Sequence, residues 1–130
     1  MSHNKAKGSK IERELFQIFV DNHFRAVRVA GSGVMENAEC DIIAGKKGSG
    51  KYAIEVKSSK APIKYITKEQ IEKFVIFADI FGLSPVIALR FNREGWLFIH
   101  PKHLRDSGKN FVITLEEANK NGKKFSQFFG

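Results

Sequence analysis

The sequence predicts one α/β domain, built around a central mixed β-sheet with helices on its faces. Segments with helical and with strand periodicity follow in the order helix, three strands, helix, two strands, which is typical of this fold class. The length of 130 residues suits one hydrophobic core, and no internal repeat or long linker divides the chain. We therefore expect a single domain over residues 1–121 and a short C-terminal tail over residues 122–130.

Two helices are expected, each with signals for its ends. The first spans residues 10–23, with Ser9 as a candidate N-cap. The second begins after Thr67, whose spacing to Gln70 is that of a capping box, and it ends near Gly82. The apolar residues of the first helix recur at a spacing that places them on one face: Ile11, Leu15, Ile18 and Phe19.

Five strands are expected, at residues 27–30, 39–44, 52–58, 85–91 and 96–99. The link between the second and third strands, residues 45–50, is rich in glycine, as the loop of a β-hairpin is. These two strands are therefore expected to pair with each other.

The charge of the chain is strongly positive and unevenly distributed. The net charge is +8, and six lysines but one acid lie between Lys46 and Lys64. Six further basic residues lie between Lys5 and Arg28. Such clusters are typical of proteins that bind a phosphate backbone, although the solvated surface of a basic cytosolic protein is the alternative.

Other features of the composition favour a cytoplasmic, nucleoid-associated protein. No apolar run approaches the roughly 20 residues of a membrane helix, and the N-terminal residues lack the apolar segment of a signal peptide. The sequence has one cysteine, which excludes an intramolecular disulfide and is expected in a reducing compartment.

Three charged residues lie inside the two strands of the expected hairpin: Asp41, Glu55 and Lys57. Because side chains alternate along a strand, Glu55 and Lys57 share one face, and hairpin pairing brings Asp41 beside them. Two adjacent carboxylates repel each other and require a cation, and Mg²⁺ prefers such oxygen ligands. The residues therefore predict a metal site. The alternative is an ion-pair cluster on a solvated face of the sheet.

A fourth candidate ligand is Glu12 in the first helix. Helical spacing places it on the same side as Phe16 and Phe19, near the buried face, from which it could reach the sheet. However, Ser9 and Glu12 also have the spacing of a capping box. Spacing alone does not decide between these two roles.

The second helix is apolar on nearly all sides, which indicates that it is buried on more than one side. A second subunit is the simplest cover for the outer side. We therefore expect a homodimer, and the alternative is a helix in the middle of the domain. The residues expected at the dimer interface are Phe74, Phe77 and Phe81.

The arrangement of Asp41 before Glu55-Val56-Lys57, preceded by a helix with an acid, resembles the PD-(D/E)-x-K nuclease superfamily. Residues 7–15 (KGSKIEREL), 27–32 (VRVAGS) and 95–99 (GWLFI) further resemble the archaeal Holliday junction resolvase family. The resemblance covers roughly residues 5–115. It implies a restriction-endonuclease-like fold and the cleavage of DNA.

The resemblance also implies roles for individual residues. It implies Mg²⁺ as the cofactor, with Mn²⁺ able to substitute. The superfamily has proline before its aspartate where this chain has Cys40, and Gln70 falls where many members carry a helix glutamine near the site. The implied catalytic residues are Glu12, Ser32, Asp41, Glu55 and Lys57. The implied metal ligands are Glu12, Asp41, Glu55 and the main-chain carbonyl of Val56. The residues expected to bind DNA are Arg13, Arg28, Lys46, Lys47, Lys51, Lys60 and Lys64.

Together these features predict a Mg²⁺-dependent endonuclease that resolves four-way DNA junctions in recombination and repair. It would introduce paired symmetric nicks with 5′-phosphate ends, and a symmetric dimer would match the two-fold junction. One alternative is a related nuclease that acts on flaps, nicks or duplex ends. Others are a non-catalytic architectural DNA-binding protein and, from the charge alone, an RNA-binding protein of the translation machinery.

The C-terminal tail contains an aromatic triplet that resembles a sliding-clamp binding motif: Phe125, Phe128 and Phe129. The match is degenerate, because Gly122 stands where such motifs usually have Gln. An exposed apolar triplet would be a liability without a partner. The alternative is that the three rings pack onto the domain.

Overall fold

The computed structural model describes residues 2–29 and 39–130. Its first helix, α1 (Ser2–Asp21), begins well before the expected residue 10. The sequence pattern missed residues 2–9 because they carry no apolar stripe. Ser9 therefore lies inside the helix, and the predicted capping box of Ser9 with Glu12 is wrong. No helix among the described residues is long and apolar enough to cross a membrane.

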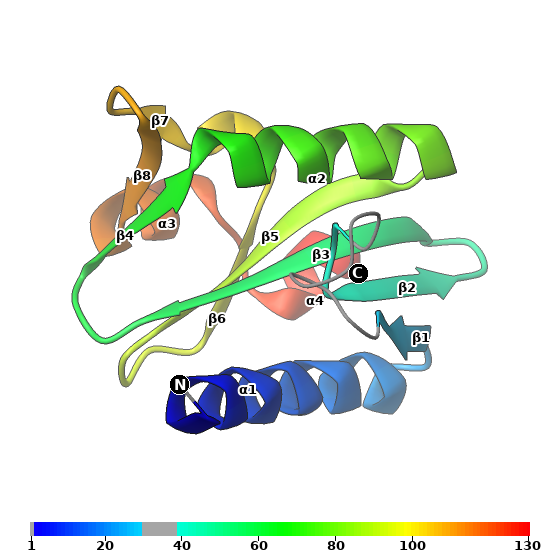
Figure 1. The fold of residues 1–130 in the computed structure, drawn as a ribbon. Coiled ribbons are helices and arrows are strands. Elements are labelled where there is room, and N and C mark those ends of the chain that lie inside the picture. The colour runs from blue at the N-terminus through cyan, green and yellow to red at the C-terminus, as the bar shows by residue number, and fades with distance from the viewer. Residues whose placement is uncertain (1, 30–38) are drawn as a thin grey trace.

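The central sheet is mixed, as predicted, and has the strand order β1-β2-β3-β5-β6 (Figure 1). Strands β3 and β5 pair in parallel, and the other neighbouring pairs are antiparallel. The hairpin of β2 and β3 is confirmed. The five strands are β1 (Arg25–Arg28), β2 (Ile42–Lys46), β3 (Gly50–Ser59), β5 (Ser84–Phe91) and β6 (Trp96–Ile99).

A second, three-stranded antiparallel sheet was not predicted from the sequence. Its strand order is β4-β8-β7, from β4 (Ile63–Thr67), β8 (Asn110–Thr114) and β7 (Arg105–Asp106). The 3₁₀ helix η1 (Pro101–His103) precedes β7, and α3 (Leu115–Asn121) follows β8. Apolar residues of β4, β8 and α3 join the core on the side of the central sheet that faces α2.

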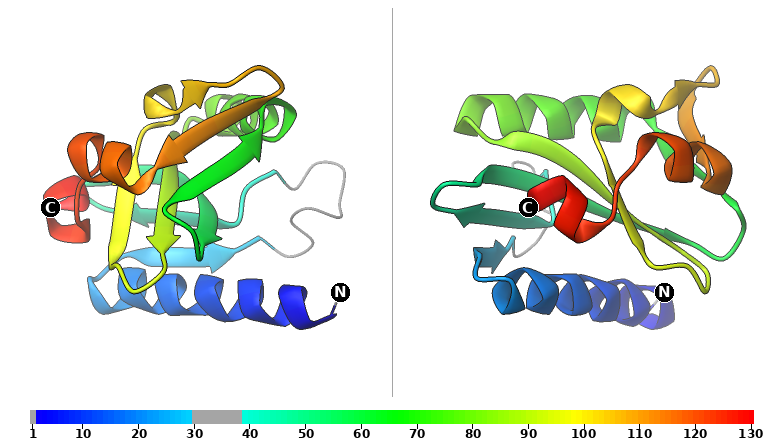
Figure 2. Two further views of the ribbon diagram at one scale, coloured as in Figure 1. Left: turned by 90° about the vertical axis from the view of Figure 1, so that its left-hand side faces the viewer. Right: turned by 180° about the vertical axis from the view of Figure 1, so that it is seen from behind.

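Helices cover both faces of the central sheet. Figures 1 and 2 show α1 along one face and α2 (Lys68–Phe81) along the other. On the α1 side, Leu15 and Phe19 pack with Phe98 of β6. On the α2 side, Ile71 and Phe74 pack with strand residues such as Leu89.

Helix α2 lies at the surface rather than in the middle of the domain. Ile71, Phe74 and Ala78 are buried against the sheet. The helix ends at Gly82, whose φ of 69° is the left-handed conformation that favours glycine at this position. The outer side carries an exposed apolar group, here called the α2 patch: Ile76, Ile80 and Phe81, which are 57%, 76% and 61% exposed.

The α2 patch changes the predicted dimer interface. Phe74 is fully buried in the core, so its prediction as an interface residue is wrong. Phe77 is partly buried against the same core and contacts the exposed Phe81, with ring centroids 4.7 Å apart. Of the three predicted residues, Phe81 is thus the most available to a partner.

The C-terminal residues pack onto the domain. Lys123 forms a β-bridge with Phe98, and the short helix α4 (Phe125–Phe129) follows. Phe129 is 4% exposed, and its ring centroid lies 5.1 Å from that of Phe19 and 4.9 Å from that of Tyr52. This is the packed alternative for the aromatic triplet. Clamp binding, which would require α4 to leave the core, stays a prediction.

Candidate active site

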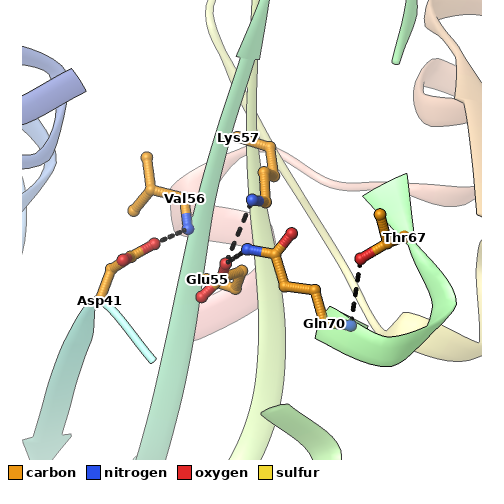
Figure 3. A network of polar contacts seen from close by, with 6 residues as sticks. All are labelled: Asp41, Glu55, Val56, Lys57, Thr67 and Gln70. Carbon is orange, nitrogen blue, oxygen red and sulfur yellow. Dashed lines mark hydrogen bonds and ion pairs between the residues drawn. The ribbon is translucent and has the colours of Figure 1, made fainter. Parts of the chain in front are cut away.

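The β2–β3 hairpin brings the three predicted charged residues together at one end of the sheet. Ile42 pairs with Ile54, so Asp41 lies directly beside β3 as the chain enters β2. The Oδ2 atom of Asp41 accepts a 2.8 Å hydrogen bond from the backbone N–H of Val56. The Nζ atom of Lys57 lies 3.3 Å from the Oε2 atom of Glu55 (Figure 3).

Glu55 occupies a position where a core residue would be expected. It shares a face of β3 with the fully buried Ala53, and its partner across the sheet is Ile87 in the core on the α2 side. Glu55 is 4% exposed and is the one charged residue that is buried within the part of the chain that the structure describes. The alternative of an ion-pair cluster on a solvated sheet face is therefore wrong for this residue.

Helix α2 contributes a further contact to Glu55. The Nε2 atom of Gln70 donates a 2.8 Å hydrogen bond to Glu55 Oε2. The backbone N–H of Gln70 donates to the side chain of Thr67, which caps the helix. The capping box expected from the sequence is thus only half formed, because the Gln70 side chain reaches the active-site carboxyl instead (Figure 3). The expected proximity of Gln70 to the site is confirmed.

Burial and the charge of Asp41 raise the pKa of two other carboxyl groups of the site. Burial raises the pKa of Glu55 to about 8, the neighbouring Asp41 adds to this effect, and Lys57 opposes it. Burial and the charge of Asp41 also raise the pKa of Glu12, whereas Arg28 opposes them. Ionisation of Glu55 and Glu12 is therefore unfavourable in the protein alone, and an additional cation beside them would favour it.

Comparisons with known proteins agree with this geometry. Residues 3–130 match the model of the family described as archaeal Holliday junction resolvase (Hjc). The chain belongs to the archaeal Holliday junction resolvase family. The match extends beyond residues 5–115, because it includes the C-terminal helix.

Individual members of the family are similar over most of their length. The crossover junction endodeoxyribonuclease Hjc of Methanocaldococcus jannaschii is 45% identical over 114 residues, which are 87% of this chain and 80% of that protein. The Archaeoglobus fulgidus enzyme of the same name is 38% identical, with 97% of each chain covered. The solved structure of Archaeoglobus fulgidus Hjc, a Holliday junction resolvase, matches with a TM-score of 0.83 and 35% identity, over 92% of this chain and 95% of that chain.

Within this resolvase-family fold, Glu12 lies on the α1 side of the sheet and pairs with a basic residue. Its Oε1 atom lies 3.4 Å from Arg28 Nη2 of β1. Ser9 lies inside α1, so Glu12 does not form a capping box with it, which was one of the two roles considered for Glu12. Arg28, predicted to bind DNA, is thus at the edge of the site. Ser32 lies outside the described residues.

The predicted DNA-binding residues do not form one continuous group. Lys46, Lys47 and Lys51 lie at the turn end of the hairpin, where they line an open hollow of about 630 Å³. Arg25 lines the same hollow and was missed in the sequence, although it is part of the basic cluster before Arg28.

The remaining basic residues lie elsewhere. Arg13 is exposed on α1, and Lys60 is exposed just beyond the end of β3. Lys64 is half-buried on β4, close enough to Lys57 for the two charges to affect each other. Lys51 and Lys57 are six residues apart on β3, which corresponds to roughly 20 Å along an extended strand. The positive charge thus extends along the molecule from the hairpin turn to the carboxyl cluster.

Cys40 comes directly before Asp41, just ahead of β2. Its side chain is fully buried in the core on the α2 side. Burial and the neighbouring Asp41 and Glu55 raise the pKa of its thiol to about 12. Cys40 therefore acts as a small apolar residue that holds the start of β2 against the core.

The acids of the site suit a metal that needs few protein ligands. Within residues 2–29 and 39–130, no three Asp, Glu, His or Cys side chains are gathered closely enough to hold a metal by themselves. Asp41 and Glu55 are nevertheless adjacent and both have carboxylate oxygens. Mg²⁺ commonly binds through one or two carboxylates and retains several waters, so this pair fits its requirements.

Proposed function

We propose that the protein is a structure-specific endonuclease that resolves four-way DNA junctions in recombination and repair. It introduces paired symmetric nicks and leaves 5′-phosphate ends. The observation that carries this proposal is the buried Glu55, held between Lys57 and Gln70 and adjacent to Asp41. A buried carboxyl with a raised pKa weakens a fold, so its position is better explained by chemistry than by stability.

The proposed cofactor is Mg²⁺, for which Mn²⁺ can substitute. Asp41, Glu55 and the main-chain carbonyl of Val56 would hold it, with Glu12 as a further acid nearby. The adjacent carboxyl groups of Asp41 and Glu55 support this assignment. Burial and the charge of Asp41 raise the pKa of Glu55, and a bound divalent cation would offset both effects by stabilising the ionised form. When bound, the ion would supply Lewis-acid activation of water and neutralise charge on the phosphate.

The chain's own residues have distinct tasks in this reaction. The N–H of Val56 fixes the orientation of Asp41, and Gln70 fixes that of Glu55. Lys57 lies on the same face as Glu55 and stabilises the negative charge that develops on the phosphate. Arg28, which pairs with Glu12 at the edge of the site, would bind a flanking phosphate of the DNA.

A homodimer is proposed to act on the two-fold junction, with the α2 patch at its interface. The exposed Ile76, Ile80 and Phe81 support this arrangement, because contiguous exposed apolar side chains mark interaction surfaces. The basic residues at the hairpin turn would then contact the junction arms. Such an enzyme works where the DNA is, in the nucleoid.

The proposal is tested with a synthetic four-way junction and a linear duplex of matched arms, each with Mg²⁺ or EDTA. Wild type is compared with Asp41→Asn and Glu55→Gln, and with Glu116→Gln, which removes an exposed acid on α3. We expect wild type and Glu116→Gln to make paired nicks in the junction only with metal. The two site variants should bind the junction and cut it at least about 10²-fold more slowly.

Two results would contradict the proposal. Binding of the junction by wild type without cleavage in Mg²⁺ or Mn²⁺ would favour an architectural DNA-binding protein. Faster cleavage of the linear duplex, or of flaps and nicks, would favour a nuclease with another substrate.

A further inference from the structure

Lys64 occupies an unusual position on β4. This strand follows β3 through a short connection (Figure 1). Across this connection, the Ser59 hydroxyl donates a 2.8 Å hydrogen bond to the Ile63 carbonyl. Residues 64 and 66 share one face of β4 because side chains alternate. Ile66 is 3% exposed and belongs to the core on the α2 side, whereas Tyr65 on the other face is 56% exposed. Lys64 therefore faces inward, where the strand pattern would place an apolar residue.

The charge of Lys64 is not balanced by an acid. In the part of the chain that the structure describes, no carboxylate forms an ion pair or hydrogen bond with its ammonium group. A second cation, Lys57, lies close enough for its charge to affect that of Lys64. Burial and the repulsion from Lys57 both lower the pKa of Lys64.

This arrangement is unfavourable for the protein alone. A half-buried ammonium group loses hydration, and a second lysine nearby adds repulsion. Lys57 is in part compensated by Glu55 at 3.3 Å, but Lys64 has no such compensation among the described residues. A half-buried lysine without an acidic partner, close enough to a second lysine to be affected by its charge, is suited to bind an anion. A DNA phosphate is the anion that the proposed reaction brings to Lys57.

Lys64 was expected to bind DNA from the charge of its segment. We propose that it does so in the active site, where it acts with Lys57 to hold a backbone phosphate within one nucleotide of the cleaved bond. This assignment rests on the proposed function and makes it more specific. Lys64 thereby differs from Lys46, Lys47 and Lys51, which lie at the other end of β3. Its task is to position the cleaved strand, whereas theirs is to bind the arms.

The main experiment measures whether the effect of changing Lys64 depends on the charge of individual phosphates. Lys64→Met and the control Lys120→Met, which removes an exposed charge from α3, are assayed on a four-way junction under single-turnover conditions at saturating protein. A series of junctions carries one uncharged methylphosphonate at successive positions around the cut. We expect Lys64→Met to slow cleavage about tenfold or more on unmodified DNA, since a charge-assisted hydrogen bond is lost. Lys120→Met should match wild type.

The methylphosphonate series then locates the contact. At one methylphosphonate position next to the cut, Lys64→Met should have no further effect on the cleavage rate. The phosphate charge that Lys64 binds is already absent from that DNA. At all other positions, the effects of the variant and of the modification should multiply. Lys64→Arg, which keeps the charge, should recover most of the cleavage rate.

A second readout separates DNA binding from a structural role. Without DNA, Lys64→Met should raise the melting temperature, because an uncompensated buried charge is replaced by an apolar side chain. A lowered melting temperature, together with an equal loss of cleavage at every methylphosphonate position, would assign Lys64 to packing and overturn the inference. Wild-type cleavage by Lys64→Met would overturn it as well.

The inference and the proposed function fail in distinguishable ways. If wild type neither binds nor cuts the junction, the proposed function is wrong and the inference falls with it. If wild type cuts normally and Lys64→Met shows no coupling to any phosphate, the proposed function stands and the inference alone is wrong.

Discussion

The two faces of the central sheet are built in opposite ways. On the α1 side, the chain covers its own apolar residues, and Phe129 of α4 closes a cluster of aromatic rings that includes Phe19 and Phe98. On the α2 side, the buried carboxyl of Glu55 lies within the core, while the α2 patch is exposed outside it. The aromatic cluster on the α1 side is thus covered by the chain itself, whereas the α2 side combines a buried carboxyl with an exposed apolar patch.

The largest effect on stability is expected on the α1 side. Phe129→Ala would remove a ring that contacts Phe19, Tyr52 and Phe98, and should lower the free energy of unfolding by about 3–5 kcal/mol. Denaturant unfolding measures this loss, with Ser126→Ala on the exposed side of α4 as the control. A loss below about 1 kcal/mol would mean that α4 is not seated on the core, and would reopen the tail to clamp binding.

A smaller, pH-dependent effect is expected on the α2 side. The pKa of Glu55 is about 8 in the folded protein, against an ordinary value of 4.5. The folded state therefore binds this proton more tightly than the unfolded state, and stability in EDTA should fall as pH rises from about 5 to 8. The slope from this group is at most about 1.4 kcal/mol per pH unit.

Glu55→Gln tests this pH dependence, because it keeps the shape of the side chain but cannot ionise. Unfolding of this variant in EDTA should lose the slope, whereas the control Glu72→Gln, at an exposed position on α2, should keep it. Parallel curves for wild type and Glu55→Gln would show that Glu55 is ionised in the folded protein throughout this range.

The smallest effect on the protomer is expected at the α2 patch. Ile76 and Ile80 are exposed, so the double change Ile76→Glu with Ile80→Glu should alter protomer stability by about 0.5 kcal/mol or less. The same change should convert a dimer into monomers, because it places charges in an apolar interface. Sedimentation measures the association, with Val27→Glu on β1 as the control, because Val27 is as exposed as Ile76 at 57%. An unchanged dimer would place the interface elsewhere.

The sequence predicted the elements whose patterns are regular. The hairpin strands flank a glycine-rich turn, so the juxtaposition of Asp41, Glu55 and Lys57 could be expected from their pairing. Strand β4 was missed because Lys64 interrupts the apolar alternation on its inner face. Lys64 was expected to bind DNA from the charge of its segment, but its inward position on β4 could not be inferred before the strand was known.

Capping motifs show a further limit of sequence patterns. Ser9 and Glu12 have the spacing of a capping box but lie inside α1, whereas Thr114 and Glu117 have the same spacing and form a complete box at the start of α3. The second pair was a signal for the unpredicted α3. The same spacing therefore forms a cap in one part of the fold and not in another. Gln70 is a further example, because its side chain donates a hydrogen bond to Glu55 instead of completing the capping box with Thr67.

Cys40 has a practical consequence for experiments in solution. It is the only cysteine in the sequence, and a thiol with a pKa of about 12 in a closed core reacts negligibly with maleimides at neutral pH. A cysteine introduced at Lys47 on the hairpin turn would thus be the single site of fluorophore attachment, without prior removal of Cys40. The native chain is already suited to observing one labelled molecule as it meets a junction arm.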